Sequence, residues 1–361
     1  MNSYYTDYIK GNSAAISGGR LWVASNSANV VFSFSLETYF MESMIVVQEE
    51  LVDELFSKII CCDSYLFLIP NNAASMWRID IGNGKATQID IGIKEEEKKI
   101  QGKFKTAYLW HNKLHLFGHG INACVVYDMD SGNYKRVSLG NEKMRLSHVM
   151  ASDEEFCYLP VLNQDMIMKY DCQSSSIACI KVHLDGIHVN YATIFQNKIV
   201  LAVPNDSLLF IDLKSWETMT KTMNVIPEEY KDDEAIYRRI IRNGKTTIII
   251  PSATGTLYYS RNGSDYSEII IDDKCFRGKK RGFPRYEFDL LTDDKLYIQS
   301  RVDGGVCEID LESVAIARHM PYIPKEIIRE ISTNVLRIKK EPMIKEKKDI
   351  ILSDFINYVF I

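Results

Sequence analysis

The chain has 361 residues, of which 46% are hydrophobic and 25% are charged, values that are ordinary for a globular protein. Its formal net charge is −5 at pH 7, which argues against a protein that binds nucleic acid through bulk charge. No apolar run reaches the roughly 20 residues needed to span a bilayer, and the first residues lack the apolar core of a secretory signal. We therefore expect a cytoplasmic protein with no membrane span and no nucleic-acid partner.

Cysteine and histidine spacing gives no sign of a metal site. The eight cysteines include no CxxC pair and lie mostly in apolar runs, where a thiol behaves as a small hydrophobic group. His111, His115 and His119 are spaced by four, which in an extended strand spreads them over about 27 Å. That span is too long for one ion, so we predict neither a metal nor a cofactor.

A pattern of four short strands repeats along the chain. In residues 104–139, four apolar runs are separated by polar turns, which is typical of an antiparallel meander. Equivalent positions recur at intervals of 41 to 50 residues. In chain order, we predict seven units over approximately residues 13–50, 55–93, 103–140, 145–184, 187–225, 235–272 and 284–322.

The third strand of most units ends in an apolar residue followed by aspartate. This carboxylate opens the turn to the fourth strand, because it can accept backbone N–H bonds two residues further on. The aspartates are Asp80, Asp128, Asp171, Asp212 and Asp310. In the sixth unit, the turn with Ser260, Asn262, Gly263 and Tyr266 resembles one Asp-box turn of sialidase-type propellers. A single copy is a turn device and does not imply sialidase chemistry.

The second strand of each unit is almost continuously apolar, which indicates that both of its faces are covered. Such a strand fits between neighbouring sheets in a ring. Proline cannot donate a ladder hydrogen bond and therefore ends a strand. Four of these runs end in this way, at Pro70, Pro160, Pro204 and Pro251.

Seven four-stranded units at this period resemble the broad β-propeller superfamily, which includes WD-repeat, Kelch and quinoprotein-like members. The set lacks the Kelch double glycines and the Gly-His…Trp-Asp spacing of WD repeats. The resemblance implies an all-β, seven-bladed propeller over residues 1–322 and no particular activity. We expect residues 323–361 to form a tail that packs on the propeller, helical near 324–331 and 352–359 with a short strand at 335–338.

The resemblance implies that a ligand meets the mouth of a central channel between the innermost strands. Ten residues before the second turn residue of each first hairpin, five of the seven units carry a basic residue or histidine. They are Lys10, Lys103, Arg145, His188 and Arg285. Like charges in a concavity repel unless an anion offsets them, which predicts a site for a phosphate, a sugar acid or an acidic segment. The alternative is that these side chains point outward or pair with the acidic residues of 228–234.

The loops between second and third strands are small and polar. Amide side chains both donate and accept hydrogen bonds, which suits hydroxyl-rich ligands such as glycans. From these loops the candidate ligand-binding residues are Asn71, Asn163, Asn205 and Arg301. The alternative is ordinary turn chemistry.

Two functions are open. We favour a non-catalytic binding or scaffolding propeller that recognises a protein partner, a glycan or a sugar phosphate at the channel mouth, because no nucleophile–base or metal motif is present. The alternative is a propeller lyase or hydrolase acting on a carbohydrate or ester. In that case His148, Tyr191 and Arg238 are the candidate base, acid and charge stabiliser. Whether the chain is an enzyme is left open.

Overall fold

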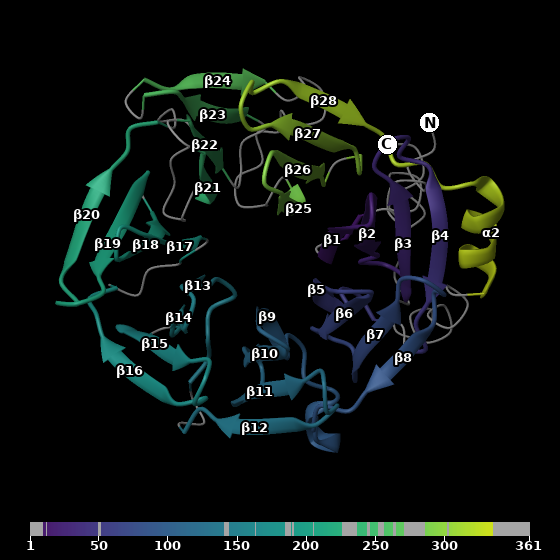
Figure 1. Cartoon of the computed structure of the whole chain (residues 1–361), viewed down its shortest axis with the longest axis horizontal. Coiled ribbons are helices and arrows are strands. Elements are labelled where there is room, and N and C mark those ends of the chain that lie inside the picture. The colour runs from purple at the N-terminus through teal and green to yellow at the C-terminus, as the bar shows by residue number, and fades with distance from the viewer. Residues whose placement is uncertain are drawn as a thin grey trace, which may run out of the picture.

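Seven four-stranded antiparallel sheets form a ring in the computed structural model (Figure 1). In each sheet the strands follow sequence order from the central channel to the rim. The chain is therefore a seven-bladed β-propeller, and the predicted fold class is confirmed. The structure describes residues 10–11, 13–49, 52–140, 144–162, 164–184, 189, 191–204, 206–225, 237–243, 246–251, 256–262, 265–270, 286–301 and 303–334.

The first four blades span residues 13–181. Blade 1 consists of β1 (Ser13–Ser17), β2 (Arg20–Ala24), β3 (Val30–Ser35) and β4 (Met41–Val46). Blade 2 consists of β5 (Phe56–Cys62), β6 (Tyr65–Pro70), β7 (Met76–Asp80) and β8 (Ala86–Ile89). After the short 3₁₀ helix η1 (Glu95–Glu97), blade 3 consists of β9 (Phe104–Trp110), β10 (Lys113–Gly118), β11 (Ala123–Asp128) and β12 (Tyr134–Ser138). Blade 4 consists of β13 (Ala151–Ser152), β14 (Phe156–Pro160), β15 (Met166–Asp171) and β16 (Ile177–Lys181).

The last three blades span residues 192–319 and are followed by one helix. Blade 5 consists of β17 (Ala192–Phe195), β18 (Lys198–Val203), β19 (Ser207–Asp212) and β20 (Thr218–Thr222). Blade 6 consists of β21 (Tyr237–Asn243), β22 (Thr246–Pro251), β23 (Thr256–Ser260) and β24 (Ser267–Ile270). Blade 7 consists of β25 (Tyr286–Leu291), β26 (Lys295–Ser300), β27 (Val306–Asp310) and β28 (Ile316–His319). The helix is α2 (Lys325–Asn334).

The predicted role of the third-strand aspartates is confirmed by their hydrogen bonds. Asp80 Oδ1 accepts from the backbone N–H groups of Gly82 and Asn83, at 2.8 and 3.2 Å. Asp128, Asp171, Asp212 and Asp310 make the equivalent turn bonds. The backbone N–H groups of Ser215 and Lys214 lower the pKa of Asp212, so the carboxylate that closes the turn stays ionised.

The core lies between blades. Trp22 of β2, for example, is buried in a cluster with Leu66 and Leu68 of the next blade. Burying one large apolar side chain stabilises a fold by roughly 1.5 to 3 kcal/mol, so each blade depends on its neighbours for stability. No helix in the described ranges is long and apolar enough to cross a membrane.

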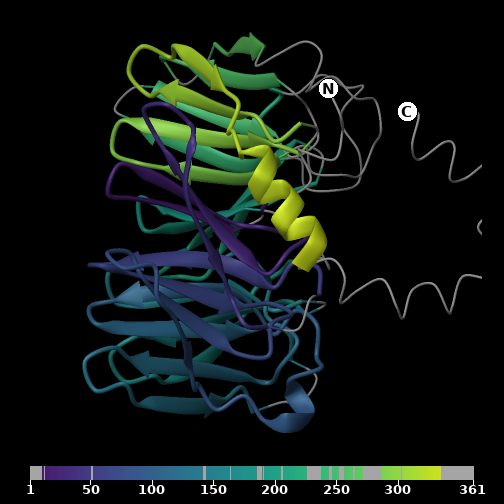
Figure 2. The same cartoon turned by 90° about the vertical axis from the view of Figure 1, so that its right-hand side faces the viewer.

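The ring closes where blade 7 meets blade 1. Tyr322 donates its N–H to the carbonyl oxygen of Tyr39 at 2.9 Å, and its own carbonyl accepts from the N–H of Met41 at 3.0 Å. Helix α2 then lies against blade 1, beside β4 (Figures 1 and 2), where Ile331 joins the apolar cluster of Phe32. The helix extends three residues beyond the predicted range, while the predicted strand at 335–338 and helix at 352–359 lie outside the described residues.

Candidate functional site

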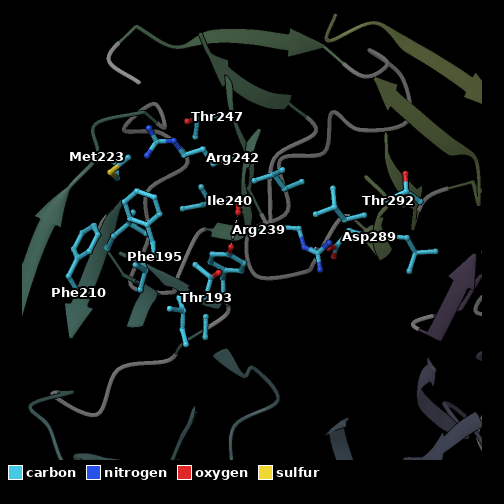
Figure 3. Close-up of a pocket in the computed structure, with 18 of the residues that line it drawn as sticks. Thr193, Phe195, Phe210, Met223, Arg239, Ile240, Arg242, Thr247, Asp289 and Thr292 are labelled. Atoms are coloured by element: carbon cyan, nitrogen blue, oxygen red, sulfur yellow. Dashed lines mark hydrogen bonds and ion pairs between the residues drawn. The ribbon is translucent and has the colours of Figure 1, made fainter. Parts of the chain in front are cut away.

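A cavity of about 1680 Å³ occupies part of the central channel and continues outward between blades 5 and 6. Residues of β1, β5, β17, β21 and β25 line its channel part. Figure 3 shows Arg239 and Asp289 in this part, with Phe195 and Phe210 in the outward part and Ile240 between them. Blades 1, 2, 5, 6 and 7 therefore all contribute to one site.

The described residues that line the cavity are strongly biased toward positive charge. Five are basic and one is acidic, although the whole chain has more acidic than basic residues. The basic residues are Lys58, Lys221, Arg239, Arg242 and Arg261, and the acidic residue is Asp289. A concave surface with this excess attracts anions, because its low-dielectric walls focus the field.

The three charges in the channel come from equivalent places in three blades. Lys58, Arg239 and Asp289 each stand six residues before the second turn residue of the first hairpin. The four other blades place an uncharged apolar residue at this position. Those residues are Ala14, Ala107, Val149 and Ala192.

Each of these three charges directly follows a break in strand register. The pairing shifts between Phe56 and Lys58 in β5 and between Tyr237 and Arg239 in β21. It also shifts before Asp289 in β25. β-Bulges of this kind re-aim the side chains that follow them, and they are over-represented next to functional sites. In β1 and β17, which carry alanine at this position, the pairing with the next strand shows no shift, whereas β9 has a shift between Phe104 and Thr106, just before its Ala107. The shift is therefore not confined to the blades that carry a charge.

Asp289 bridges two arginines. Its Oδ1 accepts from Arg238 Nε at 2.6 Å, and its Oδ2 lies 2.7 Å from Arg239 Nε. The side chain of Asp289 is 11% exposed, against 21% and 31% for the two arginines. Arg238 also donates to the carbonyl oxygens of Tyr286 and Glu287, at 2.7 and 2.9 Å. Arg238 is thus held by protein groups, whereas Arg239 keeps part of its guanidinium open to the cavity.

Lys58 reaches from blade 2 toward blade 3, where its Nζ donates to the carbonyl oxygen of Ala107 at 3.2 Å. Within the described residues, no carboxylate lies within 4 Å of this ammonium group. The side chain of Lys58 is exposed to the channel, and desolvation by the surrounding channel walls, together with Arg239, lowers its pKa. Lys58 therefore makes no close ion pair among the described residues, and Asp289 acts on it only from a longer distance.

Tyr191 lies beside these charges, at the start of blade 5. Its hydroxyl donates to the carbonyl oxygen of Ile240 at 2.7 Å. Burial raises the pKa of Tyr191, so the phenol stays protonated at neutral pH. This hydrogen bond links blade 5 to blade 6 where the cavity turns outward.

The outward part, which we call the 5/6 cleft, is lined by Arg242 and by aromatic and apolar side chains: Phe195, Val200, Leu208, Phe210, Met223, Ile240 and Tyr266. The guanidinium carbon of Arg242 lies 5.1 Å from the centre of the Phe195 ring, a cation–π contact across the cleft. The cleft therefore combines apolar walls with a cationic rim.

Three of the predicted site residues lie near one carboxylate, that of Glu287. Lys10, Arg238 and Arg301 all interact electrostatically with Glu287. Arg301 Nε lies 3.6 Å from Glu287 Oε1. Burial raises the pKa of Glu287, although the three cations act in the opposite direction. Of the basic residues predicted to form a ring, Lys10 thus interacts with an acid of the protein, Glu287, while the acidic residues of 228–234 lie outside the described residues.

Two other predicted residues hold the connection between blades 2 and 3. Lys103 is fully buried, and its Nζ donates to the carbonyl oxygens of Ile100 and Asn72, at 2.7 and 3.2 Å. Asn71 is also buried, and its amide donates to the carbonyl oxygen of Glu54 at 3.0 Å. Their ligand-binding role stays a prediction, and the observed contacts are structural.

Arg145 and His148 are exposed residues before blade 4. Arg145 lies near His119, whose pKa is lowered mainly by burial and partly by Lys105 and Arg145. The candidate roles of Arg145 and His148 also stay predictions. His188, Arg285, Asn163 and Asn205 lie outside the described residues.

Lys58, Arg239 and Asp289 are not among the residues predicted from the sequence. One signal is visible there: each is a charged residue inside a short innermost strand, in FSKIICC, YRRIIRN and YEFDLL. In the described ranges, no group of three or more histidine, cysteine, aspartate or glutamate residues is placed to hold a metal ion.

No family model matches the chain, and no curated protein is significantly similar to it in sequence. Among solved structures, it resembles virginiamycin B lyase from Staphylococcus aureus with a TM-score of 0.61 and 12% identity, over 84% of this chain and 95% of that chain. A streptogramin B lyase gives a TM-score of 0.61 and 9% identity, over 88% and 96% of the two chains. BamB from Moraxella catarrhalis gives a TM-score of 0.50 and 10% identity, over 81% of both chains. Likeness at these identities shows the propeller fold and no activity.

Proposed function

We propose that the protein is a non-catalytic binding propeller that holds an anionic ligand in its channel. The observation that carries the proposal is the cavity lining, in which five basic residues face one carboxylate. We place the anion between Lys58 and Arg239, since no described carboxylate lies within 4 Å of the Lys58 ammonium group and Arg239 shares Asp289 with Arg238.

The state of Lys58 supports this location. Desolvation and the neighbouring Arg239 lower its pKa, so the protein groups alone disfavour the charged amine. A bound anion would offset both effects and raise the pKa of Lys58. Binding should therefore take up protons in a pH range where free Lys58 is partly neutral.

The enzymatic alternative has less support. The guanidinium of Arg238 is held by Asp289 and two backbone carbonyls, and the hydroxyl of Tyr191 donates to Ile240. The lyases among the similar structures share only the fold with this chain, and one propeller fold serves many functions. The similar structures also include BamB, so the fold similarity is not confined to lyases.

The test is isothermal titration with phosphate, glucose 6-phosphate, glucuronate and the uncharged sugar glucose, at low salt. We expect binding of at least one anion that weakens with salt and is at least tenfold weaker in Lys58→Met. Lys135→Met is the matched control, because Lys135 is an exposed lysine on β12 outside the cavity. If no anion binds at millimolar concentration, or if Lys58→Met and Lys135→Met behave alike, the proposal fails.

A further inference from the structure

The 5/6 cleft leaves apolar side chains of blades 5 and 6 in contact with the cavity. Among the described residues, Val200 and Leu208 of blade 5 and Tyr237 and Tyr258 of blade 6 are buried in the cluster behind this cleft. Phe210 and Tyr266 are only partly buried beside the cleft cluster. Apolar surface that neighbouring blades leave uncovered can be covered by a ligand.

Phe195 marks the open wall of this cleft. Its side chain is 37% exposed although it ends an innermost strand, β17. On one face the guanidinium of Arg242 lies over the ring at 5.1 Å. An aromatic ring presented beside a cation in this way suits a second apolar group that packs against the ring while its polar end stays near positive charge.

The cleft and the channel charges belong to the same cavity, as Figure 3 shows for Phe195, Phe210 and Arg242 on one side and Arg239 and Asp289 on the other. Asp289 is the one acidic residue in the described lining, and it is already paired with two arginines. The lining therefore disfavours a cationic ligand at both ends. A ligand that uses the whole cavity needs an anionic end and an apolar end.

We infer that the ligand is an apolar carboxylate, with its carboxylate between Lys58 and Arg239 and an aromatic or branched aliphatic group in the 5/6 cleft. This inference rests on the proposed function and adds the class of molecule that is bound. A free aromatic acid and the C terminus of a peptide that ends in an apolar residue share this chemistry. In both, the carboxylate and the apolar group are separated by a few bonds.

The test compares acetate, phenylacetate, 4-phenylbutyrate and the amide of 4-phenylbutyrate by isothermal titration. A tripeptide, acetyl-Gly-Gly-Phe with a free carboxylate, is the peptide arm. We expect 4-phenylbutyrate or the tripeptide to bind at least tenfold more tightly than acetate, and the amide to bind at least tenfold more weakly than its acid. Tighter binding of 4-phenylbutyrate would indicate a free aromatic acid as the ligand, and tighter binding of the tripeptide would indicate a peptide C terminus. Either result supports the inference.

The variant Phe195→Ala should reduce the advantage of the phenyl acids over acetate to less than threefold, while Lys58→Met should weaken every anion. Phe40→Ala is the matched control, because Phe40 is 56% exposed and does not line the cavity. If far-UV circular dichroism shows that Phe195→Ala is not folded, Phe195→Leu takes its place and should remove at least half of the advantage. If anions bind through Lys58 but the phenyl group adds nothing, the inference fails and the proposed function stands. If the amide binds as tightly as the acid and Lys58→Met has no effect, both fail.

Discussion

Asp289 gives the sharpest prediction, because its carboxylate both stabilises the propeller and opposes an incoming anion. The variant Asp289→Asn removes the negative charge that Arg238 and Arg239 share. Breaking a buried ion pair costs about 3 to 5 kcal/mol. Here the arginines are 21% and 31% exposed, and Arg238 keeps two carbonyl acceptors. We therefore expect a loss of about 2 kcal/mol in the free energy of unfolding, since water screens part of the freed charge.

The same change should strengthen anion binding by about tenfold, because Arg239 is released and the cavity gains one net positive charge. Urea unfolding followed by tryptophan fluorescence, at pH 7 and low salt, measures the first effect. Repeating it with 20 mM phosphate measures the second, since a ligand that binds the folded state raises its stability. Glu95→Gln, which removes an exposed pair with Lys98, is the control and should change neither quantity. Equal stability of Asp289→Asn and wild type, or equal stabilisation of both by phosphate, would refute this reasoning.

Three further changes test the fold. Burial lowers the pKa of His115 to about 4 from 6.5. The neutral imidazole therefore contributes its full stabilisation above about pH 6.5, and this stabilisation is lost as the pH falls toward 4, because the unfolded state takes up the proton first. His115→Phe should accordingly make the loss of stability between pH 7 and pH 5 about 2 kcal/mol smaller in urea unfolding, and an unchanged loss would contradict this. Glu49 accepts from the N–H groups of Ala74 and Ser75 and from Trp77 Nε1, at 2.8 to 3.0 Å, so Glu49→Gln should cost about 1 to 2 kcal/mol in the same assay. Ile331 is fully buried, so Ile331→Ala should cost about 3 kcal/mol and expose α2 to proteolysis, while Glu330→Ala on the exposed face should do neither.

The propeller could be predicted from the sequence because its signals are local. A turn such as the one after Asp128 needs only residues within three positions, and its hydrogen bonds follow from the side chain itself. The strand breaks at Pro70 and Pro160 are equally local, and both prolines end a strand in the structure. Repetition at a steady interval then indicated the number of blades.

The cavity could not be predicted in the same way. Lys58, Arg239 and Asp289 are far apart in the chain, and each follows a bulge that no sequence pattern marks. Counting a fixed number of residues from each hairpin assumes regular strands, and it led to Lys103, which is buried against backbone carbonyls. The pairing of Arg238 with Asp289 depends on how two neighbouring blades face each other, which the spacing of residues does not contain.

Each described sheet consists of four strands that are consecutive in the chain, and none includes a strand from a distant segment. Duplication or deletion of one complete repeat in the gene would therefore leave every four-stranded sheet intact and change only the angle between neighbours. The backbone contact of Tyr322 with Tyr39 and Met41 joins the first repeat to the last, so it would survive a change among the repeats between them. The number of blades is thus open to evolutionary change separately from the pairing of strands within a blade.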